Sequence, residues 1–184
     1  MLKIIIAPSK ILSTQSLPVT KFTKDLELLI AQMKETLANT RDPEGVGLAA
    51  PQIGKNIQLF IIQQDPNSKP SVFINPKLTL KNEKKVVNKK DKKKVGIKLE
   101  GCLSLPNVWG NVSRANRVTI EYQDEKGKLH KKQYSGFVAT ILQHEYDHLQ
   151  GILFPKHVLE QKGKLYKSYK NSKNEDIFEE IQLP

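Results

Sequence analysis

The stretch FVATILQHEYDHLQG, residues 137–151, predicts the helix around which the rest of the chain is arranged. Its side chains at steps of four, three and four residues share one helical face, and they are Phe137, Ile141, His144 and His148. Two imidazoles four residues apart lie one turn apart and can bind a single metal ion. Glu145 lies between them and can reach a water on that metal. The stretch therefore predicts a helix that carries part of a metal site.

Length and charge describe one mildly basic domain with one unusual segment. The chain has 184 residues, which suits a single domain over residues 1–184 with a sizeable core. Its formal net charge is +11, and nine of its lysines fall within residues 81–98. We expect this run to be a solvated, mobile loop or the tip of a hairpin. It either keeps the protein in solution or contacts a polyanion, for which RNA is the obvious candidate.

The cysteine content and the apolar runs bear on the compartment. Cys102 is the only cysteine, so no intramolecular disulfide can form, which is typical of a reducing compartment. No apolar run approaches the length of a membrane span, and the N-terminal apolar burst is too short for a signal segment. We therefore expect a soluble, cytoplasmic protein without a membrane partner.

The apolar periodicity predicts an α+β fold in which small antiparallel β-sheets pack around the central metal-binding α-helix. A packing helix is expected over residues 23–39. Strand pairs are expected between residues 57–63 and 71–75, 77–80 and 95–99, and 117–123 and 129–134. The first of these pairs is expected to end at Pro76.

The chain after Gly151, which offers a natural stop for the central helix, carries weaker signals. Residues 157–169 read as weakly helical and basic. Residues 176–181 are expected to form a last short helix or to belong to a mobile tail at about residues 170–184.

Two histidines cannot complete a catalytic metal site, which has three protein ligands and an open position for water. A metzincin-type protease would need a third histidine where this chain has Phe154, which counts against that class. A thermolysin-like protease takes a later glutamate, and the candidates in this chain are Glu160, Glu175, Glu179 and Glu180. Cys102 is the remaining candidate, because a thiolate suits zinc or iron(II) and this cysteine lies where a strand is expected to end.

Three stretches in this order resemble the three signature motifs of the peptide deformylases. They are GVGLAAPQ at residues 45–52, EGCLS at residues 100–104 and QHEYDH at residues 143–148. The resemblance covers roughly residues 4–167. From spacing alone the first stretch is an ordinary glycine loop that feeds a strand, so only the resemblance assigns it a function. The main departure from the family pattern is the lysine-rich insertion at about residues 81–98.

The resemblance implies a metal-dependent hydrolase that removes the formyl group from the N-terminal formyl-methionine of newly synthesised polypeptides and releases formate. It implies that Cys102, His144 and His148 hold one divalent metal ion, iron(II) physiologically, with zinc, nickel or cobalt as alternatives. The implied partner is the N-formylmethionyl nascent peptide, and the ribosome or its RNA could bind the lysine-rich loop. Glu100 and Arg114 are expected to form a supporting ion pair.

The resemblance also implies roles for the residues around the metal. Glu145 would take and return a proton, and the Gln52 side chain and the Leu103 backbone N–H would stabilise the oxyanion. The backbone at Val46 and Gly47 would pair with an extended substrate like an added strand, which requires close approach. The apolar side chains expected to line the methionine pocket are Val46, Phe137 and Ile141.

Two other functions compete with this one. The first is an H-E-x-x-H metallopeptidase, which would cleave internal peptide bonds. The second is a ribosome- or RNA-binding protein whose metal is structural. A structural site has four protein ligands, so His130 or His157 would have to supply the fourth.

Overall fold

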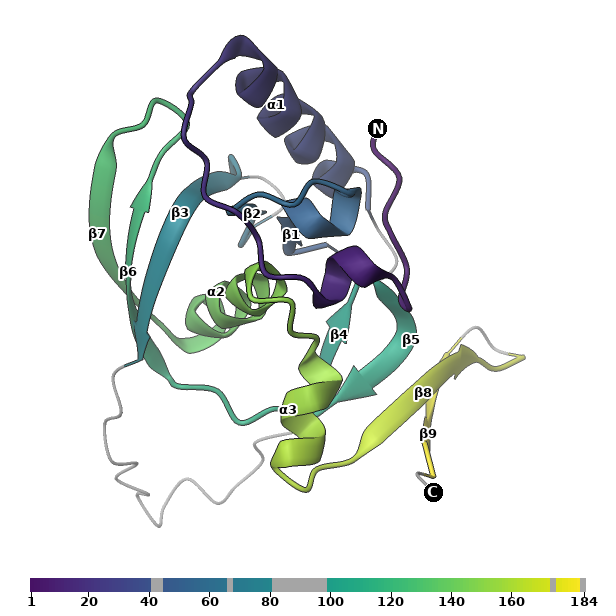
Figure 1. Ribbon diagram of the computed structural model, residues 1–184. Helices are drawn as coiled ribbons and strands as arrows, with labels where there is room; N and C mark the ends of the chain where they lie inside the picture. Colours follow the sequence, from purple (N-terminus) through teal and green to yellow (C-terminus); the bar gives the residue numbers. More distant parts are fainter. Residues whose placement is uncertain (41–44, 66–67, 81–98, 173–174, 183–184) are drawn as a thin grey trace.

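Helix α2 (Gly136–Leu149) occupies the centre of the fold, and the other elements surround it (Figure 1). The computed structural model describes residues 1–40, 45–65, 68–80, 99–172 and 175–182. One antiparallel sheet has the strand order β1-β2-β3-β6-β7, with β1 (Gly47–Ala49), β2 (Leu59–Ile62), β3 (Ser71–Leu80), β6 (Arg117–Gln123) and β7 (Leu129–Ser135). The other has the order β4-β5-β8-β9, with β4 (Glu100–Cys102), β5 (Leu105–Gly110), β8 (Leu165–Lys170) and β9 (Asp176–Glu180). The predicted α+β architecture is confirmed.

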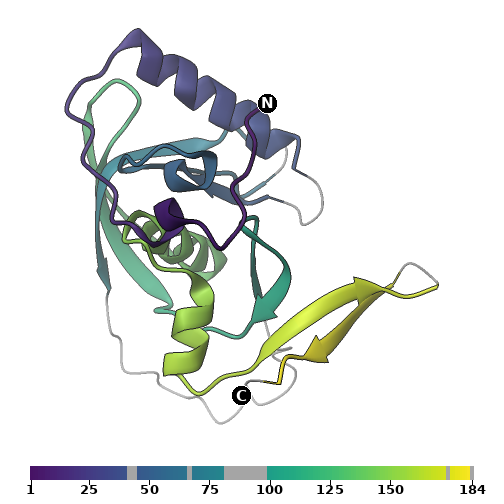
Figure 2. The same cartoon turned by 45° about the vertical axis from the view of Figure 1, so that its right-hand side comes forward.

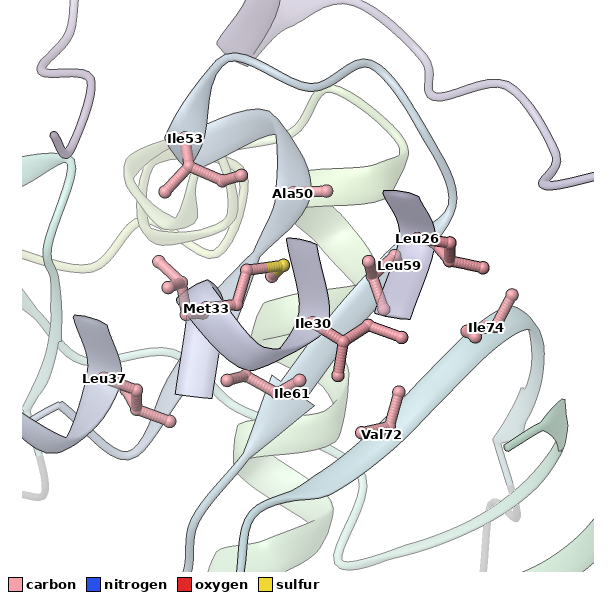
Figure 3. Packing of buried hydrophobic residues seen from close by; sticks show 11 residues of the cluster. Leu26, Ile30, Met33, Leu37, Ala50, Ile53, Leu59, Ile61, Val72 and Ile74 are labelled. Atoms are coloured by element: carbon pink, nitrogen blue, oxygen red, sulfur yellow. The ribbon is translucent and has the colours of Figure 1, made fainter. Parts of the chain in front are cut away.

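Three further helical segments are α1 (Lys24–Ala38), α3 (Phe154–Glu160) and the short 3₁₀ turn η2 (Ala50–Ile53), and another 3₁₀ turn, η1 (Lys10–Ser13), precedes them. Helix α1 is the predicted packing helix, and the Thr23 hydroxyl caps it by accepting a bond from the Leu26 N–H. Its apolar stripe packs onto β2 and β3 (Figure 3), and the buried members are Leu26, Ile30, Met33 and Leu37. This helix covers the sheet on the side away from α2.

Glycines with positive φ flank helix α2, one as its first residue and one directly after its C-cap residue. Gly136 has φ +63° and Gly151 has φ +69°, a backbone region that glycine adopts without steric cost. A Cβ at Gly151 would also lie 2.7 Å from the backbone of Ser13, so a side chain does not fit there. The predicted stop at Gly151 is confirmed.

The predicted strand pairs hold where the apolar pattern is strong. Strand β2 pairs with β3, and β6 pairs with β7. The alternate residues of β6 are buried, as expected, and they are Val118, Ile120 and Tyr122. Two independent predictions of antiparallel pairing are thus confirmed.

The expected strand end at Pro76 is wrong, because β3 runs through the proline to Leu80. The register shifts between Ile74 and Lys77, so Pro76 lies in an irregularity where its missing N–H costs no ladder bond. Asn75 has φ +49° there. Its side-chain oxygen accepts from the Val19 N–H at 2.7 Å, and its side-chain nitrogen donates to the Val19 carbonyl at 2.8 Å. The partner of the end of β3 is β6, and residues 95–98, expected to pair with it, lie outside the described residues.

The C-terminal part is a short helix followed by a β-hairpin, so the helical expectation for residues 157–169 is wrong beyond Glu160. The helix expected over residues 176–181 is wrong as well, because strand β9 pairs with β8 there. Figure 2 shows this hairpin extending away from the body of the molecule. Phe178 of β9 packs edge-on against Trp109 of β5, with ring centroids 5.9 Å apart. The lysine-rich run, residues 81–98, lies outside the described residues, and within the described ones no helix is long and apolar enough to cross a membrane.

Candidate metal centre

The end of strand β4 meets helix α2 at three side chains that can bind a metal. Cys102, His144 and His148 offer ligand atoms that all lie within 4.8 Å of one another. The Cys102 Sγ lies 3.2 Å from the His148 Nε2, and the two imidazole centroids are 5.1 Å apart. The fold thus brings together, from two separate segments of the chain, the three side chains that the sequence suggested as metal ligands.

The donor set fits a divalent transition metal. One thiolate and two imidazoles are ligands that zinc and iron(II) both accept, and three protein ligands leave a fourth position for water or substrate. Among the described residues this is the one group of three histidine, cysteine or carboxylate side chains placed to hold a metal. His130 and His157, the candidates for a fourth ligand, bond instead to Asp124 and Asp147, at 2.7 and 2.9 Å.

An ion pair orients one of the imidazoles. Glu100 Oε2 lies 3.2 Å from the Nδ1 of His144, and because a carboxylate only accepts, Nδ1 carries a proton and Nε2 is the nitrogen that would bind a metal. Arg114 donates two bonds to the same carboxylate, at 2.8 and 2.9 Å, which is the expected Glu100–Arg114 pair. Burial alone would raise the pKa of Glu100, but the bonds from His144 and Arg114 lower it to about 2.

The cysteine is held in the form that binds metals. Burial opposes ionisation of Cys102, but the electrostatic interaction with His148 and the hydrogen bonds with both imidazoles outweigh it. The pKa of this thiol therefore lies well below its usual range. A thiolate, and not a thiol, is the metal ligand, so the site is prepared for a cation.

Glu145 is a buried carboxyl group beside the ligands. The residue is 3% exposed, and its Oε2 has no hydrogen-bond partner among the residues that the structure describes. Burial is the main reason that its pKa rises to about 7. A group with this pKa can accept a proton and release it again near neutral pH.

Gly47 accommodates the Glu145 carboxylate. A Cβ at Gly47 would overlap the carboxylate of Glu145, so strand β1 can pass this close only because the residue is glycine. The sequence had indicated a need for close approach at Gly47, but for the substrate. The structure adds a second reason, because the general-base candidate itself lies against this backbone.

The side-chain amide of Gln52 points at the metal ligands. Its Oε1 accepts a bond from the Ala49 N–H at 2.8 Å, so the NH₂ group must face the other way. There it lies 3.3 Å from the Ser104 Oγ and 3.6 Å from the Cys102 Sγ. Ser104 is fully buried and had received no role from the sequence, although it closes the EGCLS motif.

The remaining predicted residues lie at different depths. Leu103 follows the Cys102 ligand directly and packs against the core under α1. Val46 and Ile141 share one apolar cluster on the α2 side of the large sheet. Phe137, one turn earlier on α2, is 51% exposed. The structure therefore brings Val46 and Ile141 together, whereas Phe137 lies at the surface.

The chain resembles known proteins along most of its length, and residues 1–164 match the family described as polypeptide deformylase. The chain belongs to the peptide deformylase family. It is 39% identical over 156 residues to the peptide deformylase of Karelsulcia muelleri, covering 83% of this chain and 76% of that protein. It is 43% identical over 141 residues to the peptide deformylase of Flavobacterium psychrophilum, covering 74% of this chain and 71% of that protein. The crystal structure of the Thermotoga maritima peptide deformylase superimposes with a TM-score of 0.72 at 32% identity, covering 85% of this chain and 97% of that one.

Membership of this family makes the chain a metal-dependent hydrolase whose reaction is removal of an N-terminal formyl group. The resemblance seen in the three motifs is thereby confirmed. The metallopeptidase and the RNA-binding protein with a structural metal are the less favoured functions.

A substitution that adds one methyl group at Gly47 tests its contact with Glu145. Gly47→Ala is expected to lower kcat/KM for formyl-Met-Ala-Ser at least about tenfold, because full loss of a general base costs about 10²–10⁴-fold. Its metal content, measured by atomic emission, should match that of the parent, because the atoms nearest to the added methyl group belong to Glu145, which is not among the proposed ligands. Unchanged kcat/KM would show that Glu145 does not need this position.

Proposed function

We propose that the side chains around Cys102 carry out the family's reaction on the formyl-methionine at the start of a newly made polypeptide. The observation that carries this proposal is the place of Glu145. It is a buried carboxyl group, one residue from His144 and beside the cluster of three proposed metal ligands, and within the described part of the chain its Oε2 has no hydrogen-bond partner. A structural metal site has no use for such a group, whereas a hydrolase needs one to move protons.

The ligands in this proposal are Cys102, His144 and His148. A divalent metal bound there would lower the pKa of a water molecule and polarise the formyl oxygen. Glu145 takes the proton that the attacking water loses. It later returns this proton to the amine nitrogen as the carbon–nitrogen bond breaks, which leaves formate and a free N-terminus.

Two donors of the chain stabilise the negative charge that develops on the formyl oxygen. The Gln52 amide is fixed in direction by its bond to the Ala49 N–H, so it donates without reorganising. The Leu103 backbone N–H, next to the Cys102 ligand, is the second donor. Such preorganised donors typically contribute about 2.7–4 kcal/mol each to transition-state stabilisation.

The substrate backbone is proposed to extend along β1. This strand is at one end of its sheet, so its outer edge can pair with an extended peptide. Val46 and Gly47 supply that edge. The methionine side chain would contact Val46, Phe137 and Ile141, of which Ile141 can form only the floor because it is buried.

Replacement of Glu145 tests its role. Glu145→Ala is expected to keep its metal and to lose about 10²–10⁴-fold in formate release from formyl-Met-Ala-Ser, since it lacks the group that moves the proton. The assay is run under anaerobic conditions, with release of formate as the readout and an internal peptide bond as the control substrate. Formate release at the parent rate would contradict the role, and cleavage of the control peptide by the parent would favour the metallopeptidase.

Iron(II) is proposed as the physiological metal, on the basis of the resemblance to the family. The ligand types alone also suit zinc, and nickel or cobalt could occupy the same site. Under anaerobic conditions, iron-loaded protein is expected to release formate faster than zinc-loaded protein and to lose this advantage in air as the metal and the thiolate oxidise. Equal rates for the two preparations would remove the preference for iron.

The lysine-rich run is proposed to contact the ribosome, where formylated chains emerge. Its nine lysines over residues 81–98 are the kind of charge that binds a phosphate backbone. Deletion of residues 84–94 is expected to weaken co-sedimentation with ribosomes and to flatten its salt dependence, while activity on formyl-Met-Ala-Ser is unchanged. If ribosome association survives the deletion, the run serves only to keep the protein in solution.

A further inference from the structure

A chain of hydrogen bonds links helix α3 to a metal ligand. The Nε2 of His157 lies 2.9 Å from the Oδ2 of Asp147, and the Nη1 of Arg114 donates to the same oxygen at 2.6 Å. Arg114 then donates through Nε and Nη2 to Glu100, at 2.8 and 2.9 Å. Glu100 accepts from the Nδ1 of His144 at 3.2 Å. Four residues from four segments, which are α3, α2, the β5–β6 loop and β4, thus lead, bond by bond, to one imidazole of the site.

The position of the Arg114 guanidinium is set from two sides. One edge of its planar fork bonds both oxygens of Glu100, and the remaining Nη1 bonds Asp147. The three side chains are shielded, with exposed fractions of 9% for Arg114, 10% for Glu100 and 15% for Asp147. Charge-assisted bonds in such surroundings are stronger and more directional than bonds at the surface.

His157 is the outermost member and the one whose only neighbour in the chain of bonds is Asp147. An ionised carboxylate only accepts, so His157 donates through Nε2. Asp147 Oδ2 has two donors, and loss of His157 would leave Arg114 alone to hold that carboxylate in place. The other ring nitrogen of His157 lies 3.5 Å from the exposed Glu160, which is too far for a firm bond.

We propose that His157 is a positioning residue for the metal ligand His144. By holding Asp147 it fixes Arg114, which fixes Glu100 and with it the direction of the His144 imidazole. The bond partners of metal-ligating histidines set ring orientation and metal affinity in this way. The inference rests on the proposed metal site, and it gives His157 of α3 a role other than that of a fourth metal ligand.

A variant that keeps an aromatic ring at position 157 but lacks the N–H donor tests this role. His157→Phe keeps the aromatic volume and removes the bond to Asp147. Loss of a direct bond partner of a ligand typically costs 10–100-fold in metal affinity, so for this outer residue we expect zinc release about three- to tenfold faster. The measurement is zinc release from the zinc-loaded protein into excess chelator. In the iron-loaded protein, kcat should fall and KM for formyl-Met-Ala-Ser should stay unchanged, because the substrate path proposed along β1 does not include α3.

Two amide side chains of different length separate positioning from simple packing. His157→Gln can place its amide nitrogen near the former Nε2, so it should release zinc at close to the parent rate. His157→Asn is too short to reach Asp147 and should resemble His157→Phe. This pair decides the question even if the phenylalanine variant does not fold.

His130 provides a matched control elsewhere in the molecule. It also bonds a carboxylate, Asp124 at 2.7 Å, and its ring stacks on Tyr122, but it lies on the β6–β7 hairpin. His130→Phe should leave zinc release unchanged. Parent-like zinc release from His157→Phe, no difference between the glutamine and asparagine variants, or equally fast release from His130→Phe would each overturn the inference. Absence of formate release by the parent would refute the proposed function and leave the zinc comparison intact.

Discussion

The close approach of one thiolate and two imidazoles in the protein interior is the constraint on which the rest of this structure depends. The three side chains come from strand β4 and helix α2, and their ligand atoms lie within 4.8 Å of one another. Both elements must be held to a fraction of an ångström for this to persist. Strand β4 is fixed through β5, where the Trp109 ring lies over Gly101, 2.8 Å from where a Cβ would stand. Helix α2 is fixed by the sheet strands packed around it.

The surroundings of the ligands are arranged by charge as much as by packing. The bonds from His144 and Arg114 keep Glu100 ionised. Burial instead raises the pKa of Glu145, on the same helix as His144, to about 7. Two glutamates close to one metal site therefore have opposite properties, which are set by the partners that each one has or lacks. In the proposed mechanism the first orients a ligand and the second moves a proton. A glycine at position 47 is what leaves room for the second.

Much of this could be predicted from the sequence, and the exceptions have physical causes. The central helix, helix α1 and two hairpins follow from apolar periods that span many residues. Cys102 was reached because the other candidate third ligands were poor, but the direction of the Gln52 amide required the resemblance to the family. The β8–β9 hairpin was missed because its charged residues hide a short alternation, and the path of β3 through Pro76 depends on an irregularity in register.

Contacts between distant segments were the least predictable feature. His157 had been considered only as a fourth metal ligand, and nothing in its local sequence indicates a bond to Asp147, ten residues earlier. Gly47 and Glu145 lie 98 residues apart in the sequence, yet a side chain at position 47 would overlap the Glu145 carboxylate. Such contacts depend on how α2, α3 and β1 pack together, which periodicity does not describe.

The ligand set itself is open to direct measurement by X-ray absorption at the zinc edge of the zinc-loaded protein. We expect one sulfur at about 2.3 Å, two imidazole nitrogens at about 2.0–2.1 Å and one further light atom. In Cys102→Ser the sulfur shell should vanish. A parent spectrum without sulfur, or with a third imidazole, would contradict a centre built from Cys102, His144 and His148.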